Sequence, residues 1–229
     1  MNDTITEINK DTFWGLIRET KDACGQDMSA MVEYLKGRLV SIGAEQAQNF
    51  HDITQAYEDL AYKYGLWDAA EIISEYGCSD DGFIDFRAWL IAQGKEVYLA
   101  ALADPDSLAE VEPYGDCSFE QMSYVGEYAY KQLTGKSTYE QTDQREYKKL
   151  VAELKQDITY KDGIQFPREG AELKQFLPRL CAKYPDRWLE PHWNLDLKVV
   201  RELFYAGTVH DHQKQVCEKK NRSHGGEAR

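Results

Sequence analysis

The segment Tyr76–Tyr98 has the sequence YGCSDDGFIDFRAWLIAQGKEVY, which is the most strongly patterned stretch of the chain. Ser79 or Asp80 can cap a helix here, because a side-chain oxygen at that position accepts hydrogen bonds from the first free backbone N–H groups. The pattern predicts one helix from about Gly82 to Ala103, which ends before Asp104-Pro105. Its apolar side chains recur at three- and four-residue steps, as on one face of a helix: Phe83, Phe86, Leu90 and Val97.

Gly94 is the exception inside this expected helix. A glycine in a helix interior costs roughly 1 kcal/mol relative to alanine, because it has more backbone freedom to lose. We therefore expect either a bend at Gly94 or the close approach of another backbone.

The run Asp-Gly-Phe-Ile-Asp in the same segment resembles the second half of a calcium-binding EF-hand loop. If Gly82 takes loop position 6, Asp81 takes position 5 and Ile84 takes position 8, as such a loop requires. Gly77 and Ala88 then take positions 1 and 12, where oxygen ligands are needed. We therefore expect a helix cap here rather than a calcium site.

Apolar residues also recur at helical spacing on both sides of this segment. A first helix around Phe13, Trp14 and Ile17 is expected to be capped by Asp11 or Thr12. Further helices are expected at residues 28–42, 50–64, 66–76, 119–133, 141–158, 171–184 and 194–205. Pro178 should kink or shorten the helix that contains it.

No segment shows the period-two alternation of a half-buried strand over several strands, and only the connector at residues 159–170 has room for a short one. The fold class is therefore all-α, a compact multi-helix domain with short loops and a polar C-terminal tail. We expect residues 1–135 to form the core domain and residues 136–206 a helical extension that packs on it. Residues 207–229 are expected to form a polar, disordered tail.

The formal net charge of −13 is unevenly distributed over the 229 residues. Residues 1–110 contain 21 acidic and 8 basic side chains, whereas residues 111–229 contain 19 of each. Such a field repels nucleic acid and anionic lipid and attracts basic proteins, although it can also serve solubility alone.

No apolar run approaches the roughly 18 residues that cross a bilayer, and the N-terminus does not resemble a signal peptide. We expect a cytoplasmic protein with no nucleic-acid or membrane partner.

Other candidate chemistry has little support. The five cysteines include no C-x-x-C pair, and no phosphate-binding glycine loop, nucleophile elbow or H-E-x-x-H helix is present. His210, His212 and Cys217 could ligate a metal, but no fourth ligand lies near them in the sequence. His51, the one histidine in the acidic half, is expected to be a surface or satisfied core residue. We expect no cofactor, no metal and no catalytic residue.

Arg87 lies between Phe86 and Trp89 in an otherwise apolar stretch, and a guanidinium near a core usually pairs with a carboxylate. One interpretation is a local ion pair that stabilises the start of the helix. The other is an arginine and aspartate pair at the floor of a cleft beside tryptophans. The candidate binding residues are Trp67, Asp80, Asp81, Asp85, Arg87 and Trp89.

Four stretches of the chain carry a family resemblance. They are FWGLI at residues 13–17, LWDAAEII at 66–73, GCSDDGFIDFRAWLIAQGKEVY at 77–98 and ALADPDSLAE at 101–110. Together they resemble a widespread bacterial family, domain of unknown function 4240 (DUF4240), from about Thr12 to Thr134. LKQFLPRLCAKY at 173–184 resembles its closing helix, with residues 136–170 inserted before it. The resemblance implies no activity, cofactor or catalytic residue.

These observations favour a non-enzymatic acidic protein that binds a basic protein, for example an immunity-like or regulatory protein. Asp80, Asp81, Asp85 and neighbouring aromatic side chains would form the binding surface. The alternative is an enzyme or small-ligand-binding protein with a cleft around Arg87, Asp80, Asp81 and Trp89. Carboxylates that spread over a surface would favour the first hypothesis, and carboxylates that converge in a pocket would favour the second.

Overall fold

The computed structural model of the chain describes residues 5–187, and the regular elements in this part are all helices, as the sequence predicts. The α-helices are α1 (Lys10–Cys24), α2 (Met28–Ile42), α3 (Ala44–Leu60), α4 (Tyr64–Ile73), α5 (Asp80–Ala92), α6 (Lys95–Ala103), α7 (Glu120–Thr134), α8 (Gln144–Lys155), α9 (Gly170–Phe176) and α10 (Pro178–Lys183). Three short 3-10 helices join them: η1 (Pro105–Glu110), η2 (Gly115–Cys117) and η3 (Thr138–Glu140).

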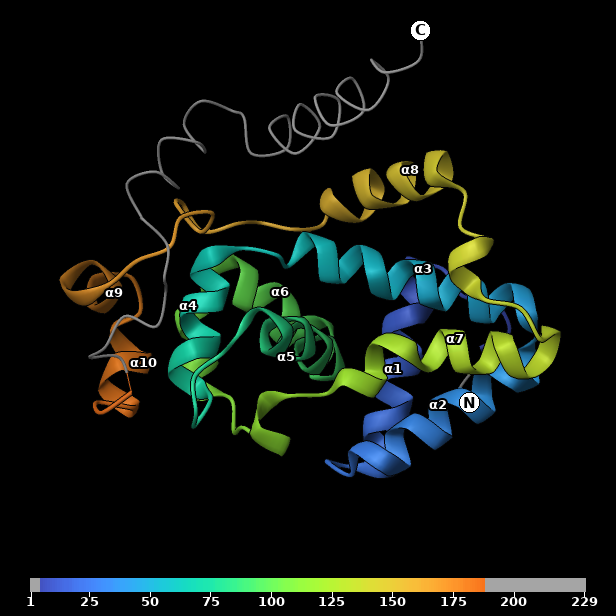
Figure 1. Cartoon of the computed structure of the whole chain (residues 1–229), viewed down its shortest axis with the longest axis horizontal. Helices are drawn as coiled ribbons and strands as arrows, with labels where there is room; N and C mark the ends of the chain where they lie inside the picture. Colours follow the sequence, from blue (N-terminus) through green and yellow to red (C-terminus); the bar gives the residue numbers. More distant parts are fainter. Residues whose placement is uncertain (1–4, 188–229) are drawn as a thin grey trace, which may run out of the picture.

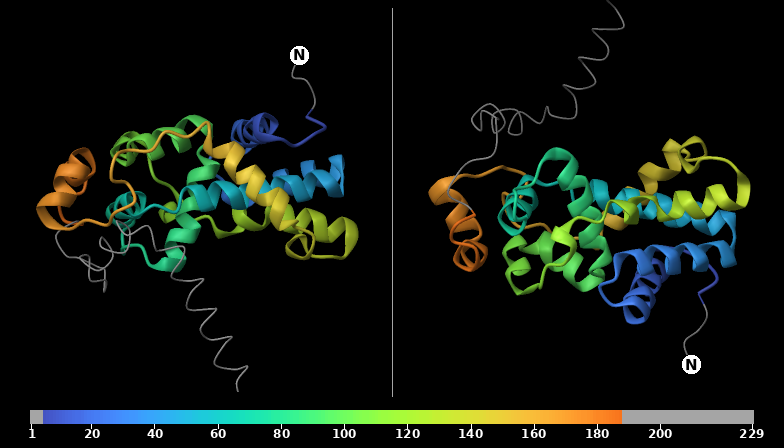
Figure 2. Two further views of the ribbon diagram at one scale, coloured as in Figure 1. Left: turned by 90° about the horizontal axis from the view of Figure 1, so that it is seen from above. Right: turned by 60° about the horizontal axis from the view of Figure 1, so that its bottom comes forward.

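Helix α3 is central to the arrangement, because it lies between α7 on one side and α8 on the other (Figure 1). Helices α5 and α6 pack at one end of α3, where α5 also contacts α7. Helices α9 and α10 lie at one end of the long axis, and α2 with the start of α3 lies at the other (Figures 1 and 2). The core therefore runs along the whole molecule rather than around one point.

The helix predicted from Gly82 to Ala103 is two helices, and this expectation was wrong. Helix α5 ends at Ala92, and α6 begins after Gly94, whose φ is 98°. A residue with a side chain adopts that φ only with strain, whereas glycine adopts it readily. No atom lies within 4 Å of where a Gly94 Cβ would be, so a close approach is not the reason for this glycine.

The helix starts and breaks confirm some of the smaller predictions and correct others. Ser79 caps α5 by accepting a hydrogen bond from the Gly82 N–H, as predicted. Helix α1 is capped by Asn9 instead of Asp11 or Thr12; Thr12 is its reciprocal partner in a capping box. Pro178 divides the predicted C-terminal helix into α9 and α10, and the connector at residues 159–170 contains no strand.

Residues 136–187 share one hydrophobic core with the earlier helices. Leu154 of α8, Ile164 of the connector and Leu180 of α10 are almost completely buried against it. The connector is also tied down by backbone hydrogen bonds from Gly65 N–H to the Ile164 carbonyl and from Lys161 N–H to the Leu102 carbonyl. The predicted helix at 194–205 and the predicted tail at 207–229 lie outside the described residues.

Gly126 sets the distance between α3 and α7. A Cβ at this position would lie 2.8 Å from the backbone nitrogen of His51 and 2.9 Å from the carbonyl oxygen of Ala47. Those atoms belong to the α3 backbone, which cannot rotate away as a side chain would. The two helices can therefore lie this close only with glycine at position 126.

We predict that Gly126→Ala destabilises the fold by about 1–3 kcal/mol, because the added methyl forces the helices apart. Gly37→Ala is the matched control, since Gly37 also lies in a helix and has no atom within 4 Å of the new Cβ. That substitution should stabilise the protein by about 0.4–1 kcal/mol, because it lowers the backbone entropy of the unfolded chain. Urea unfolding of both variants measures the difference, and equal effects would contradict the close approach.

Candidate functional site

The N-terminal end of α5 presents two aspartates to solvent. Asp80 and Asp81 occupy the first turn, where the positive end of the helix dipole favours negative charge. Both residues are exposed, and the side chain of Ser79, not of either aspartate, caps the helix. Asp80 also lies near Tyr62, and burial together with that carboxylate raises the pKa of the phenol. The sequence predicted these two aspartates as site residues from their place at the helix start.

Asp85 connects this helix to α7. Its carboxylate accepts a hydrogen bond from the Ser118 hydroxyl at 3.1 Å, and its backbone carbonyl accepts one from the Phe119 N–H at 3.2 Å. Burial raises the pKa of Asp85, and the nearby carboxylates of Glu120 and Asp81 raise it further. The first turn of α7 therefore adds an exposed carboxylate, Glu120, to the group on α5.

Tyrosines continue this surface along α7. Tyr124 lies near Glu120 and Asp85, and its ring is 6.1 Å from the ring of Tyr128. Tyr139 of η3 lies close enough to Tyr124 and Tyr128 to be electrostatically coupled to them, and it is 53% exposed. We call this surface the acidic–tyrosine face, and its members are Tyr62, Asp80, Asp81, Ile84, Asp85, Glu120, Tyr124, Tyr128 and Tyr139.

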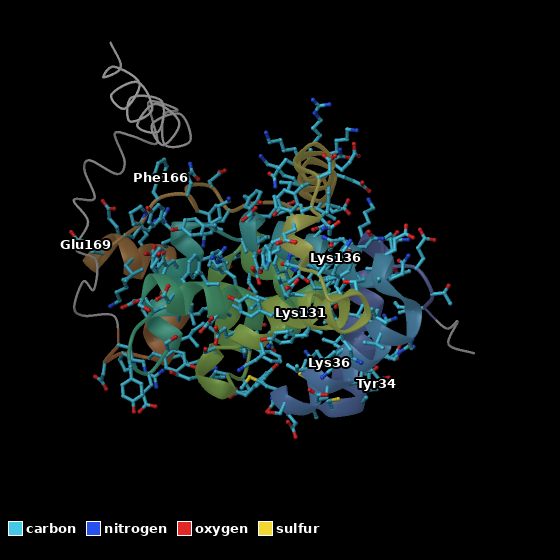
Figure 3. The ribbon with its side chains drawn as sticks, turned by 45° about the vertical axis from the view of Figure 1, so that its right-hand side comes forward. Tyr34, Lys36, Lys131, Lys136, Phe166 and Glu169 are labelled. Carbon is cyan, nitrogen blue, oxygen red and sulfur yellow. The ribbon has the colours of Figure 1, made fainter. Side chains whose placement is uncertain are left out.

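Within residues 5–187, no lysine or arginine forms an ion pair with the four carboxylates of the acidic–tyrosine face, although Lys63 lies next to its Tyr62. The guanidinium closest to its aspartates is that of Arg87, which is only 6% exposed. Lys131 and Lys136 belong to the opposite end of α7 and the loop after it (Figure 3). At about 1.5 Å per residue, Lys131 is roughly 16 Å along the helix from Glu120. A partner therefore meets carboxylates and phenol rings here.

Arg87 does not form the local ion pair at the start of the helix that one of the two interpretations predicted. Its Nε donates to the Phe83 carbonyl at 3.1 Å, and its Nη1 donates to the backbone carbonyl of Glu58 at 2.8 Å. The guanidinium lies over the ring of Tyr62 at 4.9 Å. The bond to Glu58 attaches α5 to α3, so the side chain acts as a buried bridge between helices.

A buried carboxyl group, Glu58, lies beneath the acidic–tyrosine face. Its Oε1 accepts a short 2.5 Å hydrogen bond from the Ser123 hydroxyl of α7, and its Oε2 accepts one from Gln55 at 3.1 Å. Burial raises the pKa of Glu58 from 4.5 to about 7; the Ser123 bond and the Arg87 charge oppose that rise without cancelling it. Glu58 therefore holds its proton to a higher pH than a glutamate in water does.

Glu58→Gln should stabilise the protein at alkaline pH. Because the pKa of Glu58 is raised in the folded state, the unfolded chain ionises first, so stability falls as pH rises from about 4.5 to about 7. Each pH unit in that window corresponds to about 1.4 kcal/mol. We expect a gain of about 1–3 kcal/mol at pH 8 and almost none at pH 4.5, since the new amide can still accept from Ser123 and Gln55 can flip its own amide.

Urea unfolding at both pH values measures this effect. Glu45→Gln is the control, because Glu45 is an exposed glutamate on the same helix and should change stability little and equally at the two pH values. A Glu58→Gln variant that is less stable than the wild type at pH 8 would show that the ionised carboxylate is favoured by its surroundings.

The two tryptophans among the predicted binding residues are core residues. Trp67 stacks on Phe83 with ring centroids 4.8 Å apart and donates its indole N–H to the Cys78 carbonyl at 2.7 Å. Trp89 is 1% exposed, and its ring packs against Phe86 at 5.6 Å. The two phenylalanines separate the tryptophans, so Arg87, Trp67 and Trp89 do not face a common opening.

Sequence reasoning missed the contribution of α7 to the face. Glu120, Tyr124 and Tyr128 recur at four-residue spacing, which indicates a helix face, but nothing local relates that face to α5. Their proximity to Asp85 depends on a contact between residues more than 30 positions apart in the sequence. Sequence reasoning also did not predict that Glu58 lies next to Arg87.

Two further observations concern metals and membranes. Within residues 5–187, no group of three or more His, Cys, Asp or Glu side chains is arranged to hold a metal ion. The helices of this part are all too short or too polar to cross a membrane. The His210, His212 and Cys217 pattern lies outside the described residues.

A family model described as "Protein of unknown function (DUF4240)" matches residues 8–132. The chain belongs to the DUF4240 family. No curated protein and no solved structure matches it. The DUF4240 match contains every member of the acidic–tyrosine face except Tyr139, which follows it on η3. Helices α8, α9 and α10 lie beyond the matched segment, and α8 and α10 pack on it.

Proposed function

We propose that this DUF4240 protein is a cytoplasmic, non-enzymatic protein-interaction module that binds a basic protein through the acidic–tyrosine face. An immunity-like or regulatory protein is an example of this class. The observation that carries the proposal is that four carboxylates of α5 and α7 lie together with exposed tyrosines. The arginine nearest to them, Arg87, is buried. Free thiols at Cys24, Cys78 and Cys117 are compatible with a reducing compartment.

The composition of this face favours a protein partner. Tyrosine supplies contact area at low entropic cost and is enriched at the energetic centres of protein interfaces. Uncompensated carboxylates raise the association rate with a basic partner and repel the phosphates of nucleic acids and anionic lipids. The charge of −13 on the whole chain strengthens both effects.

The alternative, an enzyme or small-ligand-binding protein with a cleft around Arg87, has weaker support. It requires Arg87, Asp80, Asp81 and Trp89 to share an opening. Trp89 is buried in the core, the two aspartates are exposed, and Arg87 bonds to backbone carbonyls. Carboxylates that stand on the surface are what we expected of a protein-binding module.

Affinity capture with the full chain tests the proposal. The wild type is immobilised at low salt in a lysate of its native host, and bound proteins are eluted with a salt gradient and identified by mass spectrometry. We expect one basic protein in stoichiometric amount, retained by the wild type and lost from a variant carrying Asp80→Asn, Asp81→Asn and Glu120→Gln. Equal recovery of that protein by the variant would refute a role for the acidic–tyrosine face.

A further inference from the structure

A small pocket opens beside the acidic–tyrosine face, between α3, η3 and α8. Its volume is about 150 Å³, and its lining includes His51, Asp52, Gln55, Tyr139, Thr142 and Tyr147. Since a water molecule occupies roughly 30 Å³ in the liquid, there is room for a planar group of a few heavy atoms. Sites for whole cofactors or drug-sized ligands are typically about 300–1,000 Å³. The pocket therefore fits the end of one side chain.

His51 is the unexplained polar group of this pocket. The side chain is 1% exposed, yet its Nδ1 is buried without a hydrogen-bond partner among the described residues. A buried polar atom left unpaired costs about 1–3 kcal/mol, so its persistence calls for a reason. Burial lowers the pKa of His51, which keeps the imidazole neutral and leaves it one nitrogen that can accept a hydrogen bond. This nitrogen lies below the surface of the pocket, so a ligand there meets the imidazole ring and not Nδ1.

Other polar groups of the pocket are also acceptors. Asp52 accepts bonds from Gln48 and Thr142 through Oδ1, and the described side chains that line the pocket include no lysine or arginine. Asp52 and Glu127 both lie near enough to His51 to oppose the lowering of its pKa. The electrostatic environment of the pocket is therefore negative, which favours a cation and disfavours an anion.

Aromatic rings complete the walls. Tyr139 meets the His51 ring edge-to-face at 4.6 Å, and Tyr147 is held in place by a 2.7 Å hydrogen bond from its hydroxyl to Asp59. Phenol faces attract cations, and a guanidinium stacks on such rings while its fork of N–H donors reaches several acceptors at once. An ammonium has no plane to stack in this way.

We propose that this pocket binds the guanidinium group of an arginine that the basic partner inserts beside Tyr139. The inference rests on the proposed function, because Tyr139 belongs to both the pocket and the acidic–tyrosine face. Asp52 would pair with the guanidinium, the His51 ring would form part of the wall, and Tyr139 and Tyr147 would bracket the guanidinium plane. The acidic–tyrosine face would then attract the partner, and the pocket would select arginine over lysine.

The pocket can be tested without the partner. N-acetyl-arginine methylamide is titrated into the full chain, and amide chemical shifts are followed by NMR. The matched probe is N-acetyl-citrulline methylamide, which has the same shape without the charge. We expect saturable shifts at α3 and η3 with the arginine probe, binding at least about tenfold weaker with the citrulline probe, and a loss of about fivefold or more in Tyr139→Ala. Tyr76→Ala is the control, because Tyr76 is 85% exposed and does not line the pocket.

Each outcome separates this inference from the proposed function. Equal binding of the two probes, or shifts confined to the start of α5, would overturn the arginine pocket. A captured partner that binds Tyr139→Ala as well as the wild type would also overturn it, while the acidic–tyrosine face could still stand. Conversely, the chain could bind the arginine probe specifically while its partner is recovered equally by the wild type and by the variant with the three charge substitutions. That result would support the pocket and refute the proposed function.

Discussion

The variant carrying Asp80→Asn, Asp81→Asn and Glu120→Gln is expected to bind its basic partner about three- to a hundredfold more weakly than the wild type at low salt. An exposed ion pair contributes about 0.2–1 kcal/mol, so three of them together give about 0.6–3 kcal/mol, and each 1.4 kcal/mol is a factor of about ten. All three side chains are exposed at helix starts, where an amide can replace a carboxylate without filling or emptying space in the core. Most of the loss should appear in the association rate and should shrink as salt rises.

A charge-matched variant separates this effect from net charge. Asp22→Asn, Glu45→Gln and Asp162→Asn also remove three negative charges, from exposed positions on α1, on the first turn of α3 and in the connector. This variant should keep nearly all of the wild-type affinity. Isothermal titration or stopped-flow binding at two salt concentrations measures both variants. Equal losses would mean that the partner senses only the overall charge.

Arg87→Ala is expected to destabilise the fold by about 3–5 kcal/mol. Removing the buried guanidinium takes away two hydrogen bonds from a charged donor, each worth about 1.5–3 kcal/mol, and leaves a space in the core. The substitution empties the space over Tyr62 and Phe83, frees the carbonyls of Phe83 and Glu58, and takes away the cation that opposes the raised pKa of Glu58. Because the bond to Glu58 attaches α5 to α3, the loss should appear as a lower free energy of global unfolding in urea.

Arg18→Ala is the control for this substitution. Arg18 is an exposed arginine on α1, and its removal should change the free energy of unfolding by less than about 0.5 kcal/mol. An Arg87→Ala protein that unfolds at the wild-type urea concentration would contradict the bridge. It would return Arg87 to the role of a side chain held for a ligand, as in the alternative hypothesis.

The helices themselves could be predicted because their signals are local. Apolar side chains at three- and four-residue steps, the Ser79 cap and the break at Pro178 depend only on neighbouring residues.

The error at Gly94 has a physical explanation. Both a kinked helix and two separate helices tolerate glycine, and only the backbone angle of 98° distinguishes them. Asn9 was missed because a cap depends on where the first turn starts, and Asp11 and Thr12 also fit the preference.

The site could be predicted only where it is local. Asp80, Asp81 and Asp85 follow from the start of α5, but Glu120 and the tyrosines of α7 reach them through tertiary contacts. Arg87 was expected to find a carboxylate nearby in sequence; instead, two backbone carbonyls accept its hydrogen bonds, one of them on another helix. His51 was expected to be a surface or satisfied core residue; it is buried in the core, but its Nδ1 has no hydrogen-bond partner among the described residues.

Cross-linking of the complex with a zero-length carbodiimide tests the central claim most directly. This reagent joins a carboxylate to a lysine only where the two are in contact, so the cross-linked peptides identify the acidic side chains at the interface. With the captured partner, we predict links from Asp80, Asp81, Asp85 or Glu120 to partner lysines, which high salt suppresses. Links confined to Asp22, Glu45 and Asp162, with none from α5 or α7, would contradict the assignment of the acidic–tyrosine face as the binding surface.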